Sequence, residues 1–397
     1  MSTSGIQCTK CLYTTNHPLG LILNKEGVCS GCLVHEEKDK LDWNNRFQLL
    51  KKITDSYKSN SNYDCIVPVT GGQDSFYIAH IVINKLNLNP LFVNFNRNFN
   101  SAVGLKNLAQ LKTIFPADFR QFTINPVIAR KVIRTTMINM GTINWLWIAG
   151  QTSLPVRLAS ELNIPLIIWG GHQGVEQVGM YSHTDEAEMT LRYRKEHDLM
   201  GIDENDIFRF DPDFSPNDLS CISYPSDEQL NKNGTRGIYL SNYLRWDPVK
   251  QHEFVREKYG YVGQKSNRTY YEFDNPDCPV YNDLQDLLKF VRLGYGKVTD
   301  QLVRDIRHKR INLTKAKKLE KKYLGKMPSE VSNFANWLGI SSENFDILLL
   351  SLVNNFSEQV LTENWRDYFS NLSKNSFKKV RIDNLIDEDY LNYGKGI

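Results

Sequence analysis

Short apolar runs and longer amphipathic runs alternate between residues 63 and 170, and they predict secondary structure. Four short runs rich in β-branched and aromatic residues predict strands at residues 64–69, 90–95, 119–124 and 164–170. The longer runs have helical spacing and predict helices at residues 75–86, 102–115, 126–138 and 154–163. Because the strand runs lack strict apolar and polar alternation, we expect strands buried on both faces. The predicted fold class is α/β, a parallel sheet wound with helices.

Changes in this pattern along the chain predict three parts. Residues 1–45 contain four clustered cysteines and predict a small metal-binding unit. Residues 46–224 carry the α/β pattern. After about residue 215 the strand signal fades, and residues 225–397 have mainly helical spacing. We expect this last part to be a mostly helical domain that binds substrate or a partner.

Three loop segments are expected to meet at one edge of the predicted sheet. Ligands of parallel sheets bind beyond the carboxyl ends of the strands. This rule brings together residues 70–75, the "NFNRN" turn after the second strand, and "GGHQGVEQ" at residues 170–177. Phe95 and Asn96, at the end of the second strand, are candidate adenosine contacts, although they are equally suited to a turn.

The first of these segments, "TGGQDS", has the composition of a phosphate-binding loop. Gly71 and Gly72 have no Cβ, so their backbone N–H groups can approach an anion at the start of a helix. Thr70 and Ser75 add hydroxyl donors, and Asp74 can cap the helix or bind Mg²⁺. An ordinary strand-to-helix turn explains the loop alone equally well. The chain contains neither GxxxxGK[ST] nor a GxGxxG after its first strand, which argues against a P-loop kinase and a dinucleotide-binding fold.

Two CxxC pairs near the N-terminus have metal-ligand spacing. Cys8, Cys11, Cys29 and Cys32 match a four-cysteine zinc site, which leaves no open position for catalysis and is therefore structural. Two local disulfides and an iron–sulfur cluster are the alternatives. The other three cysteines are scattered and predict small buried side chains.

Composition and charge narrow the class of protein. The 397 residues are 41% hydrophobic and 23% charged, which is typical of a globular protein with two or three domains. No apolar run is long enough for a membrane span, and no signal peptide is evident, so we expect a cytoplasmic protein without a membrane partner. Residues 289–326 hold 13 Lys or Arg against three Asp or Glu, so the rest of the chain is net acidic. Arg304, Arg307 and Arg310 share a helical spacing there and are candidates for binding an anionic substrate, or for a solvated helix face.

The glycine loop resembles the PP-loop, the SGGxDS signature of ATP pyrophosphatases, with Thr70 at its first position. A wider resemblance runs from Cys8 to Gly325 and includes "LPVRLASELNIPLIIWGG", "GIYLSNYLRWDPVKQHEFVREKYG" and "FVRLGYGKVTDQLVRDIRHKRI". These segments are similar to the N-acetyl sugar amidotransferases of surface-polysaccharide and lipopolysaccharide biosynthesis.

This resemblance implies a fold of the PP-loop ATP pyrophosphatase type and an AMP-forming ligase reaction. ATP adenylates the acetamido oxygen of an N-acetylated, nucleotide-linked sugar, and ammonia displaces AMP to give an acetamidino sugar. The implied cofactors are ATP, Mg²⁺ and Zn²⁺. The family often has a Gly-Glu pair after the fourth strand where this chain has Gly171-His172, so His172 is a candidate substitute for the acidic residue.

The expected site residues fall into four groups. The candidate catalytic residues are Asp74, Ser75 and His172. The candidate nucleotide-binding residues are Thr70, Gly71, Gly72, Asp74, Ser75, Phe95, Asn96 and Gly170. Arg304 and Arg307 are the candidate substrate ligands, and the four clustered cysteines are the candidate metal ligands.

Partners and rival functions complete the expectations. No cysteine lies in a glycine-rich nucleophile elbow, so we expect a separate glutaminase subunit to supply ammonia. A tRNA thiolation enzyme of the PP-loop class is the main alternative, but it usually needs a broad basic surface, which makes a nucleic-acid partner less suitable here. A zinc-binding interaction module without catalysis would leave the PP-loop unexplained.

Overall fold

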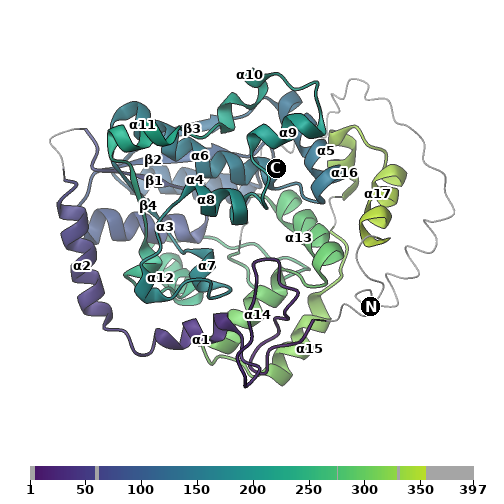
Figure 1. Cartoon of the computed structure of the whole chain (residues 1–397), viewed down its shortest axis with the longest axis horizontal. Helices are drawn as coiled ribbons and strands as arrows, with labels where there is room; N and C mark the ends of the chain where they lie inside the picture. Colours follow the sequence, from purple (N-terminus) through teal and green to yellow (C-terminus); the bar gives the residue numbers. More distant parts are fainter. Residues whose placement is uncertain (1–4, 59–61, 275, 329–330, 355–397) are drawn as a thin grey trace.

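The computed structural model describes residues 5–58, 62–274, 276–328 and 331–354 (Figure 1). Residues 355–397, the end of the predicted C-terminal region, lie outside the described residues.

A five-stranded sheet forms the centre of the fold, and every paired strand is parallel to its neighbour. The strand order is β3-β2-β1-β4-β5. The strands are β1 (Cys65–Pro68), β2 (Pro90–Asn96), β3 (Asp118–Thr123), β4 (Leu166–Trp169) and β5 (Arg236–Tyr239). This arrangement confirms the predicted α/β fold class. The sheet extends past the expected limit at residue 224, because β5 pairs with β4.

Burial of the strands follows their place in the sheet. In the central strand β1, Ile66 packs in the core on one face, whereas Cys65 and Val67 pack in the core on the other. The run therefore has no polar face, as its composition predicts. The expectation of two buried faces was wrong for β3, where five of six residues are exposed, because it is an edge strand with one neighbour.

Helices cover both faces of the sheet (Figure 1). The helices before and between the first four strands are α1 (Ser30–Glu37), α2 (Trp43–Asp55), α3 (Gln73–His80), α4 (Ala102–Ile114), α5 (Pro126–Met140) and α6 (Trp145–Leu162). A π-helical turn, Ile81–Lys85, continues α3. We expected α6 to start near residue 154, but Pro155 lies inside it, and the helix begins earlier with the buried Trp145 and Trp147.

The segment between β4 and β5 contains only short elements. Its helices are α7 (Gln173–Glu176), α8 (Leu191–Tyr193), α9 (Glu204–Phe210), α10 (Pro216–Leu219) and α11 (Asp227–Asn233). A π-helical turn spans Arg194–Asp198, and 3-10 turns span His183–Asp185 and Ser220–Ile222.

The C-terminal region is helical, as predicted. After β5 and a 3-10 turn at Leu240–Asn242, its helices are α12 (Pro248–Tyr259), α13 (Pro279–Leu293), α14 (Lys297–Arg307), α15 (Leu313–Tyr323), α16 (Val331–Leu338) and α17 (Ser342–Asn354). No strand follows β5 in the described residues. None of the helices up to residue 354 combines the length and apolarity needed to cross a membrane.

The N-terminal cysteine segment packs onto the C-terminal region instead of standing apart. The buried side chains Cys11 and Cys29 share a hydrophobic cluster with Leu302 and Val303 of α14. Figure 1 shows the N-terminal segment beside α14 and α15. The N-terminal segment thus forms one packed unit with α14 and α15.

Candidate active site

The loop from Thr70 to Ser75 joins β1 to α3 and is held by its own hydroxyl groups. The Thr70 N–H donates to Ser75 Oγ at 2.9 Å, and the Gly72 N–H donates to Thr70 Oγ1 at 3.2 Å. Gly71 has a φ of +85°, and a Cβ on it would lie 3.1 Å from the Leu108 Cβ, so this position requires glycine. The N-cap of α3 is Gly72, so no side chain of the N-cap residue covers the positive end of this helix, where an anion is favoured.

A cavity of about 240 Å³ opens above this loop, and we call it the loop cavity. Thr70, Asp74 and Ser75 form its polar part, and its apolar lining includes Val69, Val93, Phe95, Pro155 and Trp169. Gly170 also lines it. The structure thus places most of the expected nucleotide-binding residues around one space. Asn96 is not among the lining residues, because its side chain donates to Thr123 Oγ1 of the edge strand at 3.2 Å.

A second cavity of about 340 Å³ adjoins the first, since Asp74 and Gly171 line both. We call it the charged cavity. Its acidic lining residues are Asp74, Glu176, Asp274 and Asp300, and its basic ones are Lys289, Lys297, Arg304 and Arg307. Asp74 lines this space, where desolvation by the surrounding protein, followed by the charge of Asp274, raises the pKa of its carboxyl to about 6. The carboxyl stays mostly ionised at neutral pH.

The three candidate arginines have different surroundings. Arg304 lines the charged cavity, and its guanidinium makes no hydrogen bond to another described residue. Arg307 also lines it, but its Nη1 donates to the carbonyl oxygens of Glu176 and Gln177, at 3.1 and 2.7 Å. Arg310 is paired with Asp247 and Asp305 and does not line this cavity. Arg304 is therefore the one of the three whose guanidinium has no hydrogen bond or ion pair with another described residue.

His172 has a structural position instead of one in the cavities. It is 1% exposed, its Nδ1 accepts from the Gly174 N–H at 3.1 Å, and its own N–H donates to Ser241 Oγ at 3.0 Å. Burial lowers the pKa of its ring to about 4, so the ring is neutral. It lines none of the cavities described here, and its contacts are those of an N-cap for α7.

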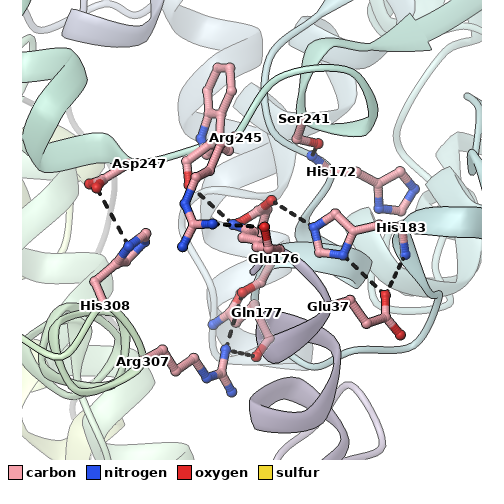
Figure 2. A network of polar contacts seen from close by, with 12 residues as sticks. Glu37, His172, Glu176, Gln177, His183, Ser241, Arg245, Asp247, Arg307 and His308 are labelled. Carbon is pink, nitrogen blue, oxygen red and sulfur yellow. Dashed lines mark hydrogen bonds and ion pairs between the residues drawn. The ribbon is translucent and has the colours of Figure 1, made fainter. Parts of the chain in front are cut away.

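A buried ion pair lies behind the charged cavity. Lys38 is 1% exposed, and its Nζ contacts Glu176 Oε2 at 2.5 Å and the Trp246 carbonyl oxygen at 3.1 Å. Figure 2 shows Glu176 facing His183, which in turn contacts Glu37 at 3.2 Å. Burial opposes ionisation of Glu176, but Lys38 and His183 outweigh it and lower the pKa of the carboxyl to about 2. Glu176 is thus an ionised residue in the wall of the charged cavity, and its contacts hold it in one orientation.

The four N-terminal cysteines come together as buried free thiols. Their sulfur atoms all lie within 4.8 Å of one another, and Cys11 Sγ is 3.7 Å from Cys29 Sγ. Backbone N–H groups of Lys10 and Cys29 point at Cys8 Sγ, at 3.3 and 3.2 Å. This donor set is compatible with a bound metal, and the four cysteines form no disulfide in the structure.

Several lining residues were missed by sequence reasoning. Glu176 lies in the "GGHQGVEQ" segment, which we expected at the ligand-binding edge of the sheet. An acidic residue in that segment was a signal that could have identified it as part of the site. Asp274, Lys289 and Lys297 come from loops and helices more than 190 residues after the PP-loop. Nothing local in the sequence marks these three residues as part of the site, because tertiary packing alone brings them there.

The fold and the loop agree with the class that the sequence resembles. A parallel sheet with a Thr-Gly-Gly-Gln-Asp-Ser loop at the carboxyl end of its central strand is the arrangement that the resemblance to PP-loop ATP pyrophosphatases implies. Residues 253–380 match the family model of the C-terminal domain of WbpG-like LPS biosynthesis proteins. This match covers less than half of the chain, and it supports the expected resemblance to proteins of lipopolysaccharide biosynthesis.

Comparison with curated protein sequences gave no match. Among solved structures, NMN synthetase from Francisella tularensis is 14% identical with a TM-score of 0.27, covering 49% of this chain and 93% of its own. The U34-tRNA thiolase NcsA from Methanococcus maripaludis, solved with its [4Fe-4S] cluster, is 13% identical with a TM-score of 0.27. The match covers 83% of this chain and 94% of the thiolase. NAD⁺ synthetase from Burkholderia pseudomallei is 11% identical with a TM-score of 0.23. The match covers 56% of this chain and 86% of the synthetase. Similarity at this level identifies neither a substrate nor a reaction.

Replacing Lys38 with methionine should destabilise the protein by about 3–5 kcal/mol, because it leaves the Glu176 carboxylate buried and unpaired. The double variant Lys38→Met/Glu176→Gln should regain most of that loss. The contribution of the ionised Glu176 to the free energy of unfolding should be fully present above about pH 4.5. It should disappear as the pH falls towards 2, because folding lowers the pKa of this carboxyl. Urea unfolding measures each effect.

The exposed pair of Lys58 and Asp55 provides the control for this experiment. Lys58→Met should change stability by less than about 1 kcal/mol. Equal losses for Lys38→Met and Lys58→Met would contradict the role assigned to the buried pair.

Proposed function

We propose that the protein is an AMP-forming, ATP-dependent amidotransferase that acts on an N-acetylated, nucleotide-linked sugar. The acetamido oxygen attacks the α-phosphorus of ATP, and pyrophosphate leaves. Ammonia then attacks the acetamido carbon, and AMP leaves with the original oxygen. The product is an acetamidino sugar, and the sum of the steps replaces one oxygen by nitrogen at the cost of one ATP.

The observation that supports this proposal most is the meeting of two cavities at Asp74. The PP-loop lines the loop cavity, whereas residues of the WbpG-like segment, among them Asp274, Lys289 and Arg304, line the charged cavity. ATP bound at the loop would direct its phosphates towards the part of the chain that carries the family match. The two halves of the proposed reaction would therefore take place side by side.

The chain's own groups suit these steps. N–H groups at the start of α3 can bind the leaving pyrophosphate, and Phe95 can contact adenosine in the apolar part of the loop cavity. The Asp74 carboxylate accepts only a long contact from Gln73 Nε2, at 3.4 Å, so it is free to bind Mg²⁺. The ion would neutralise charge on the phosphates. Arg304 offers unpaired donors to a phosphate of the sugar nucleotide.

We further propose zinc as the metal of the four-cysteine site. Zn–S bonds of about 2.3 Å in a tetrahedral site put neighbouring sulfurs about 3.8 Å apart. The separation of Cys11 Sγ and Cys29 Sγ, 3.7 Å, agrees with one shared ion. In an iron–sulfur cube each cysteine binds a different iron, so the sulfurs would lie farther apart.

A separate glutaminase subunit is the proposed source of ammonia. Burial raises the pKa of the Cys65 and Cys278 thiols, which makes them poor nucleophiles. Burial likewise raises the pKa of Cys221. None of the three has a hydrogen bond to a histidine among the described residues, so no activated thiol is available there to attack glutamine.

The purified protein should convert ATP to AMP and pyrophosphate in the presence of its sugar and ammonium. Asp74→Ala should lower turnover about 100-fold or more by removing a metal ligand. In the wild type, turnover should fall as the pH drops through about 6 and Asp74 is protonated. Chromatography of the nucleotides provides the measurement, and ADP with orthophosphate as products would contradict the PP-loop assignment.

Gly72→Val should abolish ATP binding without unfolding the protein. Gly72 has a φ of −71°, and the nearest atom to an added Cβ is Thr70 Oγ1 at 3.3 Å, so the fold tolerates a side chain that a bound phosphate would not. Calorimetric titration with ATP tests the loss of binding, and a thermal melt tests whether the variant stays folded. Normal ATP affinity in the variant would show that the loop does not bind phosphate.

Metal analysis of protein purified without added metal should give one zinc per chain. Cys29→Ser should lower the zinc content and destabilise the N-terminal segment, because the site is structural. Cys221→Ser, outside the cluster, is the control and should keep its zinc. Iron with a visible absorption band would point to a cluster instead.

The nitrogen donor tests the proposed partner. The isolated chain should use ammonium at high concentration but not glutamine, and glutamine-dependent activity should appear when the glutaminase subunit is added. Efficient use of glutamine by the single chain would contradict the two-subunit proposal.

A further inference from the structure

A third cavity, of about 150 Å³, adjoins both cavities of the candidate active site. It shares Trp169 and Gly171 with the loop cavity, and Gly171 and Gln173 with the charged cavity. Rings of Trp169, Tyr193, Tyr224 and Tyr239 form much of its wall, so we call it the aromatic cavity. None of the steps proposed above assigns it an occupant.

Its main polar feature is Asp198, which ends the π-helical turn Arg194–Asp198. π-Helical turns are frequent at functional sites, because they displace one residue from regular helix geometry. The Asp198 carboxyl makes no hydrogen bond to any residue in the described part of the chain. Burial raises its pKa to about 7, although the charge of Arg194 opposes this shift. An unpaired carboxyl in a cavity wall is costly unless a ligand satisfies it.

The tyrosine rings and this carboxyl lie close together. Burial, followed by the charge of Asp198, raises the pKa of both Tyr193 and Tyr239. The nearby cation is already committed, because Arg194 donates from Nε to Thr152 Oγ1 at 3.0 Å and contacts Glu204 at 3.3 Å. Among the described residues, the site therefore offers aromatic faces and one unpaired carboxyl, and none of its lining residues is a free cation for a phosphate.

We infer that the aromatic cavity binds the sugar ring of the substrate, with Asp198 accepting hydrogen bonds from its hydroxyl or amide groups. A pyranose has apolar C–H faces that pack on aromatic rings, and polar groups around its rim that need a hydrogen-bond partner. This inference rests on the proposed function, because it assumes that the substrate contains a sugar.

The position of the cavity agrees with this assignment. The loop cavity lies at β1 and β2 and is lined by Val69, Val93 and Phe95, which suits adenosine. The aromatic cavity lies at β4 and β5, where Trp169 and Tyr239 stack with ring centroids 6.4 Å apart. Gly171 lines all three cavities. A sugar in the aromatic cavity would thus have its acetamido group near the point where ATP phosphates and the charged cavity meet.

Asp198→Asn tests the inference with three probes: UDP-N-acetylglucosamine, UDP and ATP. Calorimetry on the full-length variant should show affinity for the sugar nucleotide reduced about tenfold or more, and affinities for UDP and ATP within about twofold of the wild type. The melting temperature should be unchanged or higher, because no hydrogen bond within the protein is lost. Asp213→Asn, at an exposed position, is the control and should change none of these values. Tyr239→Phe, which keeps the ring, should weaken sugar binding alone by a smaller factor.

Each other outcome has a definite meaning. Weaker ATP binding by Asp198→Asn would assign the cavity to adenosine and overturn the inference. Three unchanged affinities, or equal weakening of UDP and its sugar conjugate, would also overturn it while leaving the proposed function in place. A wild-type protein that binds ATP but binds none of a set of N-acetylated nucleotide sugars more tightly than the corresponding free nucleotide would contradict the proposed function itself.

Discussion

The buried contact between Lys38 and Glu176 joins segments that are far apart in the sequence. Lys38 follows the cysteine unit, Glu176 ends the short helix after β4, and the Trp246 carbonyl that completes the site precedes α12. A charge this deeply buried is tolerated only with its partner, so the three segments are tied to one geometry. Arg307 adds a second link, from α14 to the same loop after β4. The walls of the charged cavity are therefore set by polar contacts between distant parts of the chain.

This construction explains the position of the four-cysteine unit. Its buried residues pack on α14, and α14 supplies Asp300, Arg304 and Arg307 to the charged cavity. Metal binding at the cysteines would stabilise the surface on which α14 packs. It would affect the charged cavity through this packing and not by taking part in the reaction. A closed metal site that takes no part in the reaction and a functional effect of its removal are then compatible.

Local patterns in the sequence were sufficient for much of the fold. The first four strands, the helices between them and the glycine loop have strong short-range signals, and the CxxC spacing anticipated the clustered sulfurs. The short strand β5 was missed because four residues in a polar context give little signal. The site was harder to anticipate: Asp198, Asp274 and Lys38 depend on tertiary contacts that no local pattern encodes. His172 follows β4 and Asn96 ends β2, but hydrogen bonds with Gly174 and Thr123 hold their side chains outside the lining of the cavities.

The central claim is that ATP activates the acetamido oxygen, and isotope transfer tests it most directly. A nucleotide sugar with ¹⁸O in its acetamido carbonyl would be incubated with the protein, ATP and ammonium, and the products analysed by mass spectrometry. Attack of that oxygen on the α-phosphorus predicts one ¹⁸O atom in AMP, none in pyrophosphate, and an acetamidino sugar without label. AMP that contains only unlabelled oxygen, or label recovered in water, would contradict the account.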